Sequence, residues 1–202
     1  MRPMTTRTAR RGRLMLAAIT ATAAIAVTVA ALTLSGRSPG HVFPHLHPAA
    51  APSNWRHLTL PNRTAVLSYP PSLRPISGDK VAVSAARLGR HGAFQFYLNA
   101  TPRQGSEQLA RWPAFRLHLL RSDTAVSARQ VAEAHGVKFR GGTGSCVIDR
   151  YVTRVGGHHF QEIACLVVGR ISASVIVAAA PTAAWTRERP LLLQAVSAYL
   201  IR

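Results

Sequence analysis

The segment from Leu14 to Gly36 contains no charged residue and is apolar over most of its length. Its 23 residues would form an α-helix about 34 Å long, enough to cross a hydrocarbon core of roughly 30 Å. We therefore predict a basic tail over residues 1–13 and a transmembrane signal-anchor helix over residues 14–36.

The charges around this segment predict its orientation. Five arginines and no acidic residue precede it, whereas Arg37 alone stands close after it. Because basic residues favour the cytoplasmic side of a span, we expect a single-pass protein of the plasma membrane with its N-terminus in the cytoplasm and residues 37–202 outside. The alternative is a cleaved signal peptide, whose apolar region is usually only about 7–15 residues long.

A second apolar run, residues 163–180, approaches the length of a span but carries Gly169 and Arg170 near its middle. An arginine at the centre of a bilayer costs about 2.5–3.5 kcal/mol on insertion scales. A glycine at the first of two turn positions is instead typical of a two-residue hairpin turn. This run is therefore predicted to form two strands.

Residues 37–54 contain four prolines and no apolar periodicity, which predicts an extended linker. The linker carries His41, His45 and His47, and three imidazoles so close in sequence can wrap a copper or zinc ion. The alternative is a solvated linker that merely contains histidines, since nothing in the sequence pre-organises them as ligands.

Residues 55–202 have the pattern of one exported α+β domain, an antiparallel sheet with helices packed on it. Short apolar runs between turn residues predict strands at residues 55–60, 64–69, 80–88, 92–100, 146–153, 159–168 and 171–179. A further strand is expected near Val137 and Phe139, followed by a mobile glycine-rich loop at residues 141–145.

Two amphipathic helices are expected to cover the sheet. Ser106 can cap the first, whose apolar arc contains Leu109, Trp112, Phe115, Leu119 and Leu120. The second closes the chain, with an apolar face made of Trp185, Leu192, Val196, Tyr199 and Leu200. Pro113 and Pro190 each indicate a kink or a restart.

The only two cysteines, Cys146 and Cys165, lie near the ends of one predicted hairpin. A tight Gly156-Gly157 turn would leave them out of register, whereas a four-residue loop at residues 154–157 sets them directly opposite each other. The second register also pairs more apolar residues. Because disulfides persist outside the cytoplasm, we predict a Cys146–Cys165 bond.

The same register places Asp149 opposite Glu162, and like charges in that position destabilise a sheet. Three explanations remain open. The register is wrong, or Arg150 and Arg154 neutralise the pair, or the two carboxylates form a functional pair that shares a proton or a cation.

Catalysis finds little support in the sequence. A hydrolase or thiol enzyme would use Cys146 or Ser145 as the nucleophile, with the preceding glycines as backbone donors. A disulfide would remove the Cys146 thiolate, no G-x-S-x-G surrounds Ser145, and the chain contains no helical metal motif. We therefore predict no catalytic residue and no cofactor, and keep a Cys146 enzyme as the alternative.

Charge suggests a class of partner. Beyond the tail the chain carries 20 basic and 7 acidic residues, a net charge of +13. Such a surface attracts anionic lipid or an anionic wall polymer, although codon use in a GC-rich genome explains part of the arginine excess. An envelope protein is a further candidate partner. Nucleic acid is not expected, because the aromatic residues occupy core-like positions rather than alternating with basic ones.

The order of these elements resembles the PsbP-like family over about residues 55–202. The resemblance rests on the strand pair TAVLSYPPSL with its Tyr69-Pro70-Pro71 turn, on GAFQFYLNATP, on the helix WPAFRLHLL, and on Pro181 followed by a helix containing Trp185. It implies an antiparallel sheet between helical layers and a non-catalytic role in binding or assembly. It transfers no functional residue, and a fold does not fix a function.

Overall fold

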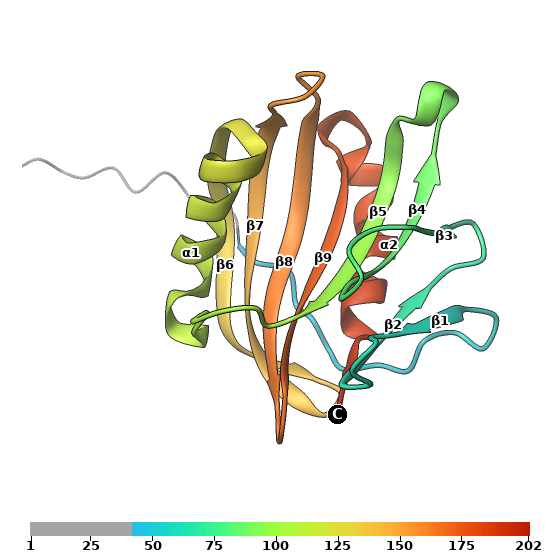
Figure 1. The fold of residues 1–202 in the computed structure, drawn as a ribbon, viewed down its shortest axis with the longest axis vertical. Coiled ribbons are helices and arrows are strands. Elements are labelled where there is room, and N and C mark those ends of the chain that lie inside the picture. The colour runs from blue at the N-terminus through green and yellow to red at the C-terminus, as the bar shows by residue number, and fades with distance from the viewer. Residues whose placement is uncertain (1–41) are drawn as a thin grey trace, which may run out of the picture. The chain divides into compact units, whose positions relative to one another are not determined.

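The computed structural model describes residues 42–202, which form two antiparallel sheets and two α-helices joined by short turns (Figure 1). The predicted tail and transmembrane helix, residues 1–36, lie outside the described residues, and so does His41. Within residues 42–202, every helix is too short or too polar to cross a membrane.

The larger sheet has seven strands in the order β3-β4-β5-β9-β8-β7-β6, and all neighbouring strands are antiparallel. Its strands are β3 (Arg74–Ile76), β4 (Val83–Leu88), β5 (Phe94–Pro102), β6 (Ala125–Phe139), β7 (Gly142–Thr153), β8 (His159–Gly169) and β9 (Ala173–Pro181). The apolar run at residues 163–180 thus forms the β8–β9 hairpin, as predicted.

The first two predicted strands form, but in a separate three-stranded sheet. It consists of β1 (Arg56–Thr59), β2 (Ala65–Tyr69) and β10 (Leu200–Ile201). The sequence placed Leu200 on the face of the last helix, but it lies in β10 opposite Val66. That helix ends at Ser197, and the chain then pairs with β2.

The two helices cover opposite faces of the large sheet. Because side chains alternate along a strand, neighbouring residues of β7 enter different cores. On one face, Cys146 belongs to the main core with Leu192 of α2 (Trp185–Ser197), together with residues of the small sheet. On the other face, Val147 packs under Trp112 of α1 (Trp112–Leu119). The sheet thus lies between helical layers (Figure 1).

Helix α1 is shorter than the sequence predicted. Ser106 caps nothing, because a 3₁₀ turn, Leu109–Arg111, precedes the helix. Pro113 then occupies the first turn, where its missing N–H costs no hydrogen bond. The chain leaves through a π-helical turn, Leu120–Thr124. In α2, by contrast, the helix continues across Pro190.

The glycine-rich segment at residues 141–145 is not a loop. Apart from Gly141 it belongs to β7, which pairs with β6, a 15-residue strand that the sequence indicated only near its end. A Cβ at Gly142 would collide with the Val168 carbonyl and Ile201. Glycine is therefore required here by close packing.

The described part of the predicted linker is extended but packed on the domain. Phe43 and Leu46 contact the main core, and the Ala49 amide donates to the Ser197 carbonyl at 3.1 Å. From Val42 onward this segment therefore forms part of the folded surface.

Candidate functional site

The β7–β8 hairpin has the register with the four-residue loop. Cys146 pairs with Cys165, and Asp149 pairs with Glu162. The Thr153 amide donates to the His158 carbonyl at 2.9 Å, which closes the loop over residues 154–157. A disulfide joins Cys146 and Cys165 on the α2 face of the sheet, where both residues are 0 % exposed. The first of the three explanations for the carboxylate pair, a wrong register, is thereby excluded.

The carboxylates of Asp149 and Glu162 lie on the opposite face, beneath α1. Asp149 is 0 % and Glu162 is 1 % exposed. Burial of two facing carboxylates is costly unless each is paired or neutral. The side chains around them show that the two residues differ in how the charge is compensated.

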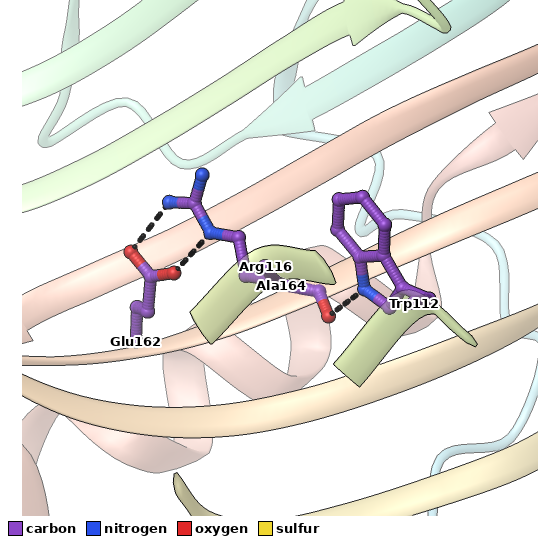
Figure 2. A network of polar contacts seen from close by, with 4 residues as sticks. All are labelled: Trp112, Arg116, Glu162 and Ala164. Atoms are coloured by element: carbon purple, nitrogen blue, oxygen red, sulfur yellow. Dashed lines mark hydrogen bonds and ion pairs between the residues drawn. The ribbon is translucent and has the colours of Figure 1, made fainter. Parts of the chain in front are cut away.

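Arg116 of α1 is the counter-ion of Glu162. Its Nε donates to Oε1 at 2.7 Å and its Nη2 donates to Oε2 at 3.0 Å, a bidentate pair (Figure 2). Burial alone would lower the pKa of Arg116, but the Glu162 carboxylate raises it above its ordinary value. Arginine is suited to this role because its planar fork matches a carboxylate.

The arginines expected from the sequence do not neutralise the pair. Arg150 Nε donates instead to Gln161 Oε1 at 2.6 Å. Arg154 Nη2 donates to the Arg121 carbonyl at 2.7 Å. The prediction failed because both residues lie on the hairpin itself, whereas the counter-ion comes from a helix 46 residues away in sequence.

A second polar contact fixes α1 to the same strand. Trp112 Nε1 donates to the Ala164 carbonyl at 2.9 Å, two positions along β8 from Glu162 (Figure 2). The Trp112 ring also stacks on Phe115, with centroids 6.0 Å apart. Helix α1 is thus attached to β8 by an ion pair and by an indole hydrogen bond.

Asp149 has no such partner. Neither of its side-chain oxygens makes a hydrogen bond with the described residues 42–202. Burial, reinforced by the Glu162 charge and opposed by Arg116 and Arg121, raises the pKa of Asp149 from 3.8 to about 8. At neutral pH this carboxyl group therefore holds a proton, and the facing pair carries one negative charge rather than two.

Tyr151 extends the cluster along β7. Burial, together with the nearby Glu162 carboxylate, raises the pKa of its phenol well above the ordinary value. The phenol is therefore neutral, and its ring stacks on Phe160 with centroids 6.0 Å apart. The cluster of Arg116, Asp149, Tyr151 and Glu162, which we call the α1 clasp, is electrically balanced at neutral pH.

The α1 clasp has shifted pKa values, but its two carboxylates are closed to a substrate, whereas Tyr151 is half-buried and also lines an open cleft. Such shifts are common at catalytic sites and also in structural ion-pair networks. Because Asp149 and Glu162 are both fully covered, a substrate would reach them only if α1 moved away. The arrangement is suited to holding a helix on a sheet.

Ser145, His135 and Glu133 lie next to one another in that order, an arrangement that the sequence did not reveal. Ser145 Oγ is 2.9 Å from His135 Nδ1, and His135 Nε2 is 3.7 Å from Glu133 Oε1. The second distance is too long for a hydrogen bond. Ser145 is also only 1 % exposed, so this arrangement offers no accessible nucleophile, and Cys146 beside Ser145 is held in the disulfide.

Two of the three linker histidines lie in the described part of the chain. The exposed rings of His45 and His47 are parallel, with centroids 5.8 Å apart. Among residues 42–202, no group of three or more His, Cys, Asp or Glu side chains is placed to hold a metal ion. Because His41 lies outside those residues, the three-histidine site stays a prediction.

Open clefts lie elsewhere on the domain. A cleft of about 960 Å³ runs between the β4–β5 turn and the β7–β8 loop, and its lining includes Phe94, Val155 and Phe160. Two smaller clefts, of about 320 and 200 Å³, share Arg150 on the face of the sheet that α2 covers. The sequence predicted none of the three.

Comparison with solved structures identifies the architecture. The solution structure of cyanobacterial PsbP from Synechocystis superimposes with a TM-score of 0.52 at 10 % identity, over 75 % of this chain and 95 % of that one. The protein has a PsbP-like fold. This agrees with the resemblance drawn from the element order, and at such low identity it concerns the fold alone.

Two other solved structures match with lower TM-scores, LpqN of Mycobacterium tuberculosis and a Pseudomonas aeruginosa protein of unknown function. LpqN, described as involved in cell envelope biogenesis, gives a TM-score of 0.38 at 13 % identity, over 82 % of this chain and 87 % of that one. The Pseudomonas protein gives a TM-score of 0.44 at 12 % identity, over 74 % of this chain and 98 % of that one. No family model and no curated protein matches the sequence.

Proposed function

We propose that this protein is a non-catalytic binding or assembly module outside the plasma membrane, held there by its N-terminal segment. The observation that carries the proposal is the buried Cys146–Cys165 disulfide between the neighbouring inner strands β7 and β8. Disulfides of this kind persist in oxidising compartments and are rare in the cytoplasm. The bond agrees with the predicted transmembrane helix at residues 14–36.

The distribution of polar groups favours binding over catalysis. The groups with the strongest pKa shifts belong to the α1 clasp or are otherwise buried. The open clefts are lined by apolar residues and arginines together with exposed polar side chains such as Asp123, His158 and His159. A net charge of +13 beyond the tail supports an anionic partner, either lipid or wall polymer.

Thiol labelling of the native protein tests the proposed location. Membranes from cells that express the full chain are treated with a maleimide in denaturant, because both sulfur atoms are buried. The intact mass is then read with and without prior reduction. We expect two added groups only after reduction, and a mass that includes residues 1–36.

Two results would overturn this proposal. Labelling of both cysteines without reduction would place the domain in a reducing compartment. A mass that lacks residues 1–36 would remove the membrane anchor. A Cys146→Ser/Cys165→Ser variant, which takes up no label, controls for reaction at other side chains.

A further inference from the structure

Three arginines surround the two clefts that share Arg150. Arg129 of β6 lies directly opposite Arg150 of β7, and Arg150 lies opposite Gln161 of β8. Arg129 lines one cleft. Arg189 of α2 lines the other, together with Gln161 and Trp185. A row across three strands and a residue of the covering helix thus line two clefts that share Arg150.

These arginines lack counter-ions in the described part of the chain. The ion pairs among residues 42–202 use Arg87, Arg116, His135 and Arg187, and none includes Arg129, Arg150 or Arg189. Facing like charges on neighbouring strands destabilise a sheet. The cost of placing Arg129 opposite Arg150 is therefore not offset by an acidic residue of this domain.

The arginines also keep unused hydrogen-bond donors. Arg189 Nε is buried and has no hydrogen-bond partner in residues 42–202. Arg150 donates through Nε to Gln161 Oε1 at 2.6 Å, which orients its guanidinium and leaves its Nη atoms out of the hydrogen bonds among residues 42–202. A buried donor without an acceptor is costly, so an acceptor from outside the chain would stabilise this arrangement.

The ligand that fits such a site is a phosphate group. A guanidinium binds phosphate through two parallel N–H bonds. The larger cleft, of about 320 Å³, reaches the size of sites that hold small ligands, and the cleft of about 200 Å³ that shares Arg150 with it adds further room. Val131, Ile148 and Trp185 line the smaller one, which suits a phosphate that carries an apolar or glycerol portion.

We propose that the clefts sharing Arg150 form a binding site for a phosphate group, in which Arg150 and Arg189 contact the phosphate and Arg129 adds charge at the rim. This inference rests on the proposed binding function and names its ligand class. Phospholipid headgroups and free phosphate share this chemistry. Val42, six positions after the end of the predicted membrane helix, lines the same cleft, which favours a headgroup.

Matched charge removal in the full chain, kept in a neutral detergent, tests the site. Arg150→Gln/Arg189→Gln is compared with Arg103→Gln/Arg170→Gln, which removes the same charge from exposed arginines outside the clefts. The melting temperature is measured against inorganic phosphate and against short-chain phosphatidylglycerol at constant ionic strength. We expect affinity to fall roughly tenfold to a hundredfold in the first variant and to be retained in the second.

The outcomes separate the site from the wider function. Tighter binding of phosphatidylglycerol than of phosphate identifies a headgroup as the ligand, whereas equal affinity identifies the phosphate alone. Equal losses in both variants, or no binding by the wild-type chain, would overturn the site. Binding of an anionic wall polymer is measured separately, in the wild type and in both variants. If all three bind the polymer with an affinity that falls with salt, the proposed binding function stands even when the phosphate site is overturned. If the wild-type chain does not bind the polymer, the proposed binding function is overturned as well.

Discussion

Asp149 and Glu162 face each other across β7 and β8, both fully buried, yet only Glu162 has a partner. Arg116 neutralises one carboxylate, and a retained proton neutralises the other. Two like groups in one environment thus take different protonation states because a single helix reaches only one of them. The stability of the α1 layer should depend on this asymmetry.

We expect the protein to lose stability as the pH rises from about 4 to 8. Asp149 has a pKa of about 8 in the fold against an ordinary 3.8, so in this range the native state holds a proton that the unfolded chain has lost. The free energy of unfolding then falls with rising pH and levels off above the folded pKa. At about 1.4 kcal/mol per pKa unit, the loss is on the order of several kcal/mol.

An Asp149→Asn variant isolates this effect from the titration of the histidines. It keeps the shape of the neutral acid and cannot ionise, so its urea midpoint should change less between pH 5 and about pH 9 than that of the wild type. Asp123→Asn, an exposed acid in the turn after α1, should keep the wild-type slope. Parallel slopes for wild type and Asp149→Asn would contradict the assignment.

Removing Arg116 should be severe. Arg116→Met leaves the Glu162 carboxylate buried without a counter-ion, a change that typically costs about 3–5 kcal/mol. Adding Glu162→Gln should restore most of the loss, because the remaining group is neutral. Denaturant unfolding measures the free energy of unfolding of the wild type, of Arg116→Met and of Arg116→Met/Glu162→Gln. Arg111→Met, at an exposed position just before α1, should stay within about 0.5 kcal/mol of wild type.

Hydrogen exchange provides a second readout of the clasp. With Arg116→Met, amides of α1 should exchange faster than those of β9, because local opening follows the weakened attachment. Uniform acceleration through the whole domain would show that the ion pair supports the entire fold rather than this helix.

The disulfide should contribute about 3 kcal/mol, the value expected from the chain entropy of a short closed loop. Its cysteines are 19 positions apart. Cys146→Ala/Cys165→Ala should lower the free energy of unfolding by that amount, and dithiothreitol should destabilise the wild type but not the variant. Equal sensitivity of both proteins to reductant would contradict this account.

The metal-binding alternative makes its own prediction. A copper site in the linker requires that His41→Ala/His45→Ala/His47→Ala abolish copper uptake measured by calorimetry. His91→Ala, which removes an exposed histidine of the β4–β5 turn, should leave uptake unchanged. Unaltered uptake in the triple variant would remove this function.

The β7–β8 register was predictable because side chains alternate along strands. Only one of two loop lengths placed Cys146 opposite Cys165 and Ile148 opposite Ile163, and the structure has that register. Its consequence for Asp149 and Glu162 followed from the sequence as well. The identity of their counter-ion did not, because which helix covers a sheet face is a tertiary property.

A signal for Arg116 was nevertheless present. It follows Trp112 by four residues, one helical turn, and residues so spaced share a helix face. Arg189 follows Trp185 in the same way in α2. Each helix begins with a buried tryptophan and has an arginine one turn later. Arg116 is paired with a carboxylate, whereas Arg189 has no carboxylate partner among residues 42–202.

Strand β6 and the glycine-rich segment were misread for opposite reasons. Most of β6 is exposed at the edge of the sheet, so residues such as Arg129, Gln130 and Glu133 give no apolar alternation. Gly142 and Gly144 indicated a loop, but they lie in β7 where neighbouring side chains leave no room for a Cβ. Such packing depends on residues distant in sequence, Ile201 among them.

The outer strands of the seven-stranded sheet bear on how the protein behaves when many copies lie close together. On one side β6 departs from regular pairing at three places and exposes charged side chains. On the other side β3 is three residues long and contains Pro75, which has no N–H to donate. Bulges, charge and proline all hinder the addition of a further strand. Neither margin of this sheet offers a template on which chains could aggregate edge to edge.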